Sequence, residues 1–218
     1  MKKLIASLII SFALITSAYA NENSLILDLD TEKTEELDIM QKIQKSTVSI
    51  FSVNGGFGRC SGVLIKQEFG LSHIITAKHC IDIDEEIYVE NIKVELIITA
   101  PNEDLAYLII RRELENKIST KLATKNAEIG ETIYHAGYPN WKLYKASGKV
   151  LKITEDWQLL DLSVLPGCSG GGVFNEDGKL LGILWGAFMF EPTAIMEPIE
   201  DINKFLHNIK LYIKWLNL

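Results

Sequence analysis

A single serine lies among glycines in the segment Pro166–Gly172, whose sequence is PGCSGGG. Such a segment can be a phosphate-binding loop, a flexible linker or the turn that carries a nucleophile. A phosphate-binding loop ends in a Lys-Ser/Thr pair before a helix, whereas this segment continues into apolar Val173 and Phe174. Glycines around a nucleophile let backbone N–H groups bind a developing oxyanion. The sequence therefore favours Ser169 as a nucleophile, with the N–H groups of Gly167 and Ser169 as oxyanion donors.

A serine hydroxyl needs a base that removes its proton, and the chain has four histidines. His79 follows an apolar run in the segment ITAKHC, whereas His73, His135 and His207 lie in contexts that favour a base less. On its own, a histidine at the end of a strand is better interpreted as a partly buried structural residue. Together with the serine segment, His79 is the best candidate for the base.

A carboxylate must fix the tautomer of such a base and stabilise its imidazolium form. Asp104 lies where a loop enters the apolar segment 105–108, so we expect its carboxylate to be half buried. The two aspartates just after His79 are too close to it in sequence and are interpreted as surface charges. Glu103, one position from Asp104, remains the nearest competitor for this role.

The elements that would position these residues are short apolar runs separated by turn residues. Their close spacing is typical of an all-β barrel or sandwich. Asp177–Gly178, between two such runs, has the turn chemistry of a β-hairpin. Twelve segments are predicted as strands: 47–53, 62–66, 73–76, 86–89, 93–99, 105–111, 132–136, 147–153, 157–162, 172–175, 180–185 and 194–198.

One helix is clearly predicted, over residues 199–216. Its polar positions carry both acids and lysines, so we expect it to pack on the β-structure rather than lie on a membrane. The apolar residues at three- and four-residue spacing that predict it are Ile199, Ile202, Phe205, Leu206, Ile209, Ile213 and Leu216.

The first twenty residues have the pattern of a secretory signal peptide. Lys2 and Lys3 precede the apolar stretch 4–16, and Ala18 and Ala20 fit a cleavage site. The alternative is a membrane anchor, for which the apolar stretch is short, since a span needs about 20 residues. We therefore expect export to the periplasm or the medium. Residues 21–45 are expected to form an acidic leader, either solvated or acting as a propeptide over the site.

Composition excludes several classes of protein. The net charge of −7 disfavours nucleic-acid binding through phosphate contacts. The scattered histidines predict no metal site, and the sequence gives no reason to expect a cofactor. Three cysteines leave room for one disulfide and one free thiol.

Taken together, these segments resemble the chymotrypsin-like serine peptidases, especially compact bacterial trypsin-like and HtrA-like members. The order His79, Asp104, Ser169 matches the order of the family's triad. TAKHC at 76–80, DLA at 104–106, GCSGG at 167–171 and LGILWG at 181–186 are similar to the family's motifs. The resemblance spans about residues 46–205 and implies no PDZ domain.

The resemblance implies two six-stranded antiparallel β-barrels followed by the C-terminal helix. The peptidase domain would then occupy residues 46–218, with barrels at about 46–115 and 125–198 and the helix at 199–216. It also implies a disulfide between Cys60 and Cys80, for which the alternative is two free thiols. The chain departs from the family pattern at Cys168, where relatives carry Asp or Asn, and at Leu184, where they carry serine.

The resemblance implies a serine endopeptidase that cleaves polypeptides through an acyl-enzyme. It places the substrate pocket at Ser163, Leu184, Trp185, Gly186 and Thr193. These positions carry no charge, so we expect a pocket for apolar side chains. Two alternatives remain: a catalytically degenerate binding module on the same fold, and an esterase that uses the same triad.

Overall fold

The structure is a computed structural model that describes residues 36–53, 59–81, 85–188 and 192–215. The chain divides into two units, residues 1–38 and 39–218, and the fold below is that of the second unit. The expected signal peptide lies outside the described residues, as does the leader up to residue 35.

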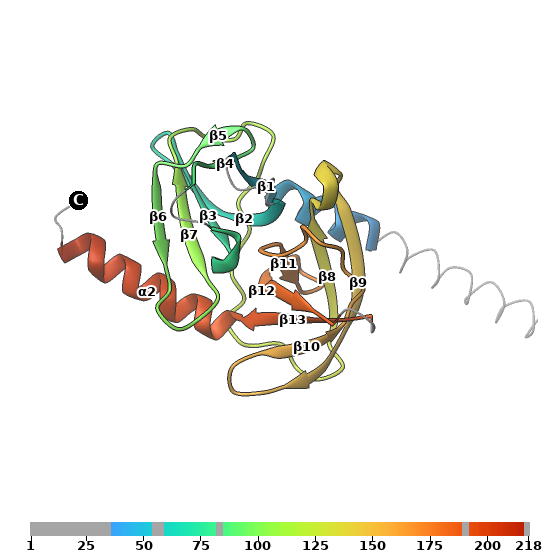
Figure 1. The fold of residues 1–218 in the computed structure, drawn as a ribbon. Coiled ribbons are helices and arrows are strands. Elements are labelled where there is room, and N and C mark those ends of the chain that lie inside the picture. The colour runs from blue at the N-terminus through green and yellow to red at the C-terminus, as the bar shows by residue number, and fades with distance from the viewer. Residues whose placement is uncertain (1–35, 54–58, 82–84, 189–191, 216–218) are drawn as a thin grey trace, which may run out of the picture. The chain divides into compact units, whose positions relative to one another are not determined.

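The first half of the fold is a curled antiparallel sheet of seven strands in the order β5-β4-β1-β2-β3-β7-β6 (Figure 1). Its strands are β1 (Thr47–Ser52), β2 (Arg59–Glu68), β3 (Leu71–Thr76), β4 (Ile87–Val89), β5 (Ile92–Lys93), β6 (Leu96–Thr99) and β7 (Ala106–Ile110).

This sheet has one strand more than expected, because the predicted strand 93–99 changes partner halfway. The N–H of Val94 donates to Ile87 on β4, and the N–H of Glu95 donates to Ile109 on β7. The chain therefore leaves β4 and joins β7 within two residues. Strands β5 and β6 therefore stand at the two ends of the sheet order, although they follow one another in sequence. This arrangement curls the sheet into a half-barrel.

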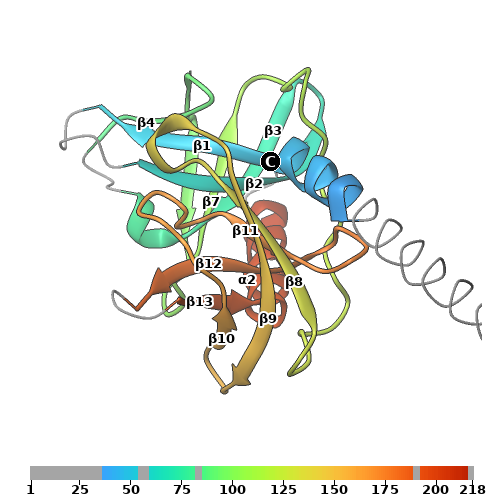
Figure 2. The ribbon, with the colours of Figure 1, turned by 90° about the vertical axis from the view of Figure 1, so that its right-hand side faces the viewer.

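The second half is a closed six-stranded barrel in the order β10-β13-β12-β11-β8-β9. Figure 2 shows β8 and β9 running side by side along it. The expected hairpin at Asp177–Gly178 joins β11 to β12, and Gly178 has a φ of +72°. The strands are β8 (Thr132–Gly137), β9 (Tyr144–Ile153), β10 (Gln158–Asp161), β11 (Gly172–Phe174), β12 (Leu180–Ala187) and β13 (Thr193–Pro198).

The predicted C-terminal helix is α2 (Ile199–Trp215), which starts directly after β13 (Figure 1). Its residues Ile199, Ile202, Phe205 and Ile209 are buried in the larger of two apolar cores, which fills the barrel and the interface between the halves. The smaller core lies in the first sheet. The expected all-β architecture with a C-terminal helix is confirmed. Among the described residues, none of the helices has the length and apolar character needed to span a bilayer.

Residues 39–46 are helical and precede β1. Met40 and Ile43 from this helix are buried in the larger core, with exposures of 8% and 1%. Removing the chain up to residue 45 would therefore remove packed side chains as well as the acidic leader.

Candidate active site

His79 lies on a single 3₁₀ turn, η1 (Lys78–Cys80), directly after β3. Hydrogen bonds from the N–H groups of Cys80 and Ile81 to Ala77 and Lys78 close this turn. The disulfide implied by the family resemblance is present, and it joins Cys80 to Cys60 on β2 across 20 residues of sequence. The histidine is therefore covalently anchored through its neighbour.

Asp104 makes two contacts with His79 from the loop before β7. Its Oδ2 lies 2.6 Å from the His79 Nδ1, and its Oδ1 accepts the backbone N–H of His79 at 2.8 Å. The backbone oxygen of Asp104 accepts the N–H of Lys78 at 3.1 Å. These three bonds fix the ring of His79 with Nδ1 toward the carboxylate, which leaves Nε2 free to act on a hydroxyl. Glu103 contacts Lys204 instead.

The environment of Asp104 favours its charged form. Burial is the largest influence and would raise the pKa of this carboxyl. Hydrogen bonds from the His79 ring and backbone, the nearby His79 charge and the Lys78 N–H together outweigh burial, so the pKa lies below its ordinary value of 3.8. The group is therefore an anion over the neutral pH range, as a partner of an imidazolium must be.

Ser169 lies in a glycine-rich segment that packs tightly against the first sheet. A Cβ placed on Gly170 would lie 2.0 Å from Thr76 Oγ1 and 2.2 Å from the Ser61 oxygen, and Gly170 has a φ of +80°. The N–H of Ser61 donates to the Ser169 oxygen at 2.8 Å. Glycine is thus required beside Ser169, because the backbone of β2 approaches the segment closely.

The two predicted oxyanion donors are available. In the described part of the chain, neither the Gly167 N–H nor the Ser169 N–H donates to another protein group. Ser61 supports this segment, since its Oγ donates to the Gly167 oxygen at 2.7 Å and accepts the Tyr138 N–H at 2.8 Å. This buried hydroxyl orients the peptide groups around Gly167.

Within the described residues, no hydrogen bond joins Ser169 Oγ to His79. The His79 Nε2 lies 3.9 Å from Cys80 Sγ, and that sulfur lies 3.6 Å from the Ser169 oxygen. His79 and the serine segment are therefore neighbours on either side of Cys80. Hydrogen bonds between a nucleophile and its base often tighten only when substrate binds.

A pocket of about 640 Å³ opens beside Ser169. Four of the five residues predicted for the substrate pocket line it, namely Ser163, Leu184, Gly186 and Thr193. All of its described lining residues are uncharged. The remaining lining residues are Val164, Leu165, Pro166, Ser169, Ala187, Phe188 and Pro192.

The fifth predicted residue, Trp185, does not line this pocket. Strand β12 has an irregular register with β13 between Leu184 and Gly186, where Trp185 lies. Trp185 packs against the larger core, and its Nε1 is buried and has no hydrogen-bond partner among the described residues. Ile183 is also buried in this core, so the pocket wall is formed by Leu184.

The other histidines lie elsewhere. His73 is buried with its Nδ1 2.5 Å from the Tyr107 hydroxyl, and His207 is exposed on α2. His135 is buried under the serine segment, where its Nδ1 lies 2.9 Å from the Gly172 oxygen. Burial lowers the pKa of His135 to about 4, against a smaller opposing effect of that hydrogen bond. His135 is therefore a neutral structural residue.

Cys60, His79 and Cys80 offer ligand atoms within 4.8 Å of one another. The two sulfurs are joined as a disulfide, and zinc requires cysteine thiolates. This group therefore does not constitute a metal site in the oxidised protein. The remaining cysteine, Cys168, is buried, and burial raises the pKa of its thiol above the ordinary value.

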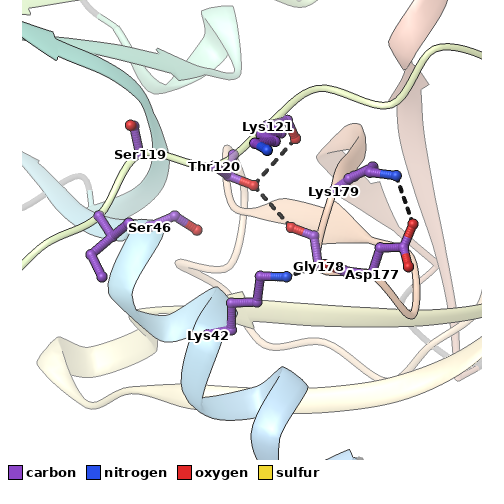
Figure 3. Close-up of a pocket in the computed structure, with 9 residues that line it drawn as sticks. Lys42, Ser46, Ser119, Thr120, Lys121, Asp177, Gly178 and Lys179 are labelled. Atoms are coloured by element: carbon purple, nitrogen blue, oxygen red, sulfur yellow. Dashed lines mark hydrogen bonds and ion pairs between the residues drawn. The ribbon is translucent and has the colours of Figure 1, made fainter.

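A second pocket, of about 490 Å³, contains none of the predicted site residues (Figure 3). Lys42 Nζ donates to the Asp177 oxygen there, Thr120 Oγ1 donates to the Gly178 oxygen at 2.9 Å, and Lys179 pairs with the Asp177 carboxylate. These bonds attach the first helix and the 118–121 segment to the β11–β12 hairpin. We interpret the pocket as a structural junction.

Two residues of the site were not identified from the sequence. Ser61 directly follows Cys60, and Glu197 is the single acid in the apolar segment AIMEPI. Glu197 is only 7% exposed, and its Oε1 accepts the backbone N–H of Asp104 at 3.0 Å. An isolated acid in an apolar strand was the sequence signal that could have identified Glu197. Its partner could not be predicted, because Asp104 lies 93 residues away in sequence.

Comparisons with known proteins show which proteins this chain is similar to. A family model described as the trypsin-like peptidase domain matches residues 60–183. A glutamyl endopeptidase of Staphylococcus epidermidis is 26% identical over 184 residues, which cover 72% of this chain and 64% of that protein. A glutamyl endopeptidase of Staphylococcus aureus strain MW2 is 29% identical over 114 residues, covering 47% of this chain and 35% of its own. The chain thus spans less than two thirds of the length of these relatives.

Solved structures share the fold. A serine endoprotease from Yersinia pestis superposes with a TM-score of 0.68 at 23% identity, covering 78% of this chain and 64% of that chain. The active form of the Rv3671c protease from M. tuberculosis gives a TM-score of 0.67 at 17% identity, covering 76% and 81%. The chymotrypsin-like fold expected from the sequence is therefore confirmed.

Proposed function

The chain belongs to the trypsin-like peptidase family, and we propose that it is an exported serine endopeptidase in which Ser169, His79 and Asp104 form the catalytic triad. The observation that carries this proposal is the pair of contacts from the Asp104 carboxylate to the ring and backbone of His79. This arrangement presents Nε2 as the atom that receives a proton.

In the proposed reaction, Ser169 Oγ attacks the carbonyl carbon of a peptide bond while its proton passes to His79 Nε2. The N–H groups of Gly167 and Ser169 stabilise the negative charge on the carbonyl oxygen. The tetrahedral intermediate then collapses, the C–N bond breaks, and His79 returns the proton to the leaving amine. Water attacks the acyl-enzyme by the same route and releases the acid product. Asp104 remains ionised throughout and stabilises the imidazolium.

We further propose that the pocket beside Ser169 binds an apolar substrate side chain. The staphylococcal relatives are named glutamyl endopeptidases, and a glutamate side chain would need a cationic or strongly donating partner. The described lining residues supply only hydroxyl and apolar groups. Burying a carboxylate there without a partner would be costly. A peptide panel that varies the residue before the cleaved bond would test this preference.

Export rests on the signal-peptide pattern of residues 1–20 alone. We propose cleavage after Ala20 and release into the periplasm or the medium. Fractionation of producing cells, with N-terminal sequencing of the recovered protein, tests this directly. A chain that retains Met1 in the cytoplasmic fraction would contradict it.

The decisive experiment is labelling with a fluorophosphonate, which reacts only with an activated serine in a working oxyanion hole. Intact mass should show one adduct on the wild type and none on Ser169→Ala. Asp104→Asn should label roughly 10⁴-fold more slowly, because the histidine is then held in the wrong tautomer. Hydrolysis of a casein substrate distinguishes a peptidase from an esterase with the same triad.

A catalytically degenerate binding module is the second candidate. The missing hydrogen bond between Ser169 Oγ and His79 favours it. In that case the folded wild type would bind peptides but would neither label nor turn over. Labelling of the wild type and its loss in Ser169→Ala would exclude this alternative.

A further inference from the structure

Glu197 contacts the predicted triad from the opposite half of the fold. It lies on β13 of the closed barrel, whereas Asp104 precedes β7 of the first sheet. The backbone N–H of Asp104 donates to Glu197 Oε1 at 3.0 Å, and the glutamate is 7% exposed. A buried carboxyl in an apolar strand is rare unless it has a partner that repays its desolvation. Here the partner is the backbone of the residue that orients the base.

The position of this contact matters because the candidate triad is divided between the two halves. His79 and Asp104 come from the first sheet, and Ser169 comes from a segment of the barrel. The Ser61–Ser169 backbone bond joins the halves at the serine. The Asp104–Glu197 bond joins them at the carboxylate. Asp104 is thereby held on one side by the His79 turn and on the other by the barrel.

The surroundings of Glu197 are strongly acidic. Asp104 and Glu103 face it from the loop before β7, and Asp201 faces it from α2. Lys204, also on α2, lies 3.7 Å from Glu103. Burial is the main cause that raises the pKa of Glu197. The hydrogen bond from the Asp104 N–H opposes it and the three acids add to it, so that the pKa rises to about 7. The carboxyl is consequently neutral in mildly acidic solution and charged in alkaline solution.

We propose that Glu197 is a positioning residue that holds the triad carboxylate in register with the serine-bearing barrel. The inference rests on the proposed function. A carboxyl oxygen can accept the Asp104 N–H whether the group is protonated or ionised. The proposed role therefore requires the hydrogen-bond acceptor and not the charge.

Two substitutions separate the hydrogen bond from the charge. Glu197→Gln keeps an oxygen that can accept the Asp104 N–H but removes the charge. Glu197→Leu removes both and leaves the Asp104 N–H unpaired. Asp201→Asn is the control, because it removes an acid from the same cluster without contacting Asp104.

The test combines the rate of fluorophosphonate labelling with the NMR resonance of the proton between His79 Nδ1 and Asp104 Oδ2. Glu197→Gln should keep this resonance because it keeps an acceptor for the Asp104 N–H, whereas Glu197→Leu should shift or lose it. The labelling rate of Glu197→Gln should stay within about threefold of the wild type, because the hydrogen bond is kept. Glu197→Leu should label at least about tenfold more slowly, since a misplaced triad group weakens the transition state. Asp201→Asn should change the labelling rate by less than about twofold.

Wild-type labelling by folded Glu197→Leu, with the resonance between His79 and Asp104 unchanged, would overturn the positioning role. If Glu197→Leu does not fold, a loss of labelling greater than tenfold in folded Glu197→Gln would contradict the proposal, because that variant keeps an acceptor for the Asp104 N–H. A wild type that never labels would contradict the proposed function, while the NMR resonance would still test whether Glu197 positions Asp104.

Discussion

The backbone N–H of Ser61 donates to the carbonyl oxygen of Ser169 at 2.8 Å, across the interface between the first sheet and the barrel. The Ser61 hydroxyl also donates to Gly167, two residues before Ser169. One residue of β2 therefore holds the backbone of both predicted oxyanion donors. Its role can be separated experimentally from its contribution to folding.

Ser61→Ala should reduce both stability and labelling. Its buried hydroxyl satisfies the Gly167 oxygen and the Tyr138 N–H, so its loss should cost about 1–3 kcal/mol in the free energy of unfolding. Labelling by a fluorophosphonate should slow because the Gly167 peptide loses its hydrogen bond to the hydroxyl, although the backbone bond from Ser61 to Ser169 remains. Ser72→Ala is a matched control, since Ser72 is equally buried but contacts Arg112 and Gln67 away from the site. Similar losses of labelling in both variants would contradict the prediction.

Gly170→Ala should prevent normal folding or destabilise the protein by at least about 3 kcal/mol, because a methyl group would overlap the Ser61 oxygen and Thr76 Oγ1. Gly70→Ala has nearly the same φ, +77° against +80°, but nothing lies within 4 Å of its added carbon. It should cost only the backbone strain, about 1 kcal/mol. Urea unfolding of both variants measures the difference. Equal costs would mean that the close approach to β2 is unimportant.

Reduction of the Cys60–Cys80 disulfide should lower the free energy of unfolding by about 3 kcal/mol, since the bond closes a 20-residue loop. The wild type should therefore unfold at lower urea concentration when a phosphine reductant is present. A double variant, Cys60→Ser with Cys80→Ser, should be insensitive to the reductant and should match the reduced wild type. A reductant effect on the double variant would point to Cys168 instead.

The contribution of Glu197 to stability should fall as pH rises from 5 to 8. In the unfolded chain its carboxyl loses its proton near 4.5, but the folded protein keeps the proton until about pH 7. The stability provided by that proton is fully present below pH 4.5 and is lost as pH rises through 7. The difference between wild type and Glu197→Gln should therefore change by about 2–3 kcal/mol over this range. Unfolding curves at several pH values would reveal it, and parallel curves would contradict it.

The sequence alone determined the segments that carry the candidate chemistry. We could recognise a histidine after a strand, an aspartate before a strand and a serine among glycines. Each proposed role (base, orienting carboxylate and nucleophile) requires a particular type of residue. Glycine at 170 is required by a positive φ and by close backbone contact, so this structural requirement can be recognised in the sequence as a glycine. The strands and α2 could be predicted for a similar reason, since local apolar periodicity reports which face is buried.

Only the tertiary structure decided which side chains support those segments. Ser61 and Glu197 act on partners 106 and 93 residues away, and a serine or glutamate in a strand gives no sign of such a partner. The change of partner at Val94 and Glu95 likewise depends on where β4 and β7 end in space. Local sequence fixes the conformation that a segment prefers. The partner of a buried polar group is set by the packing of distant segments, because each such group must find a hydrogen bond wherever the fold offers one.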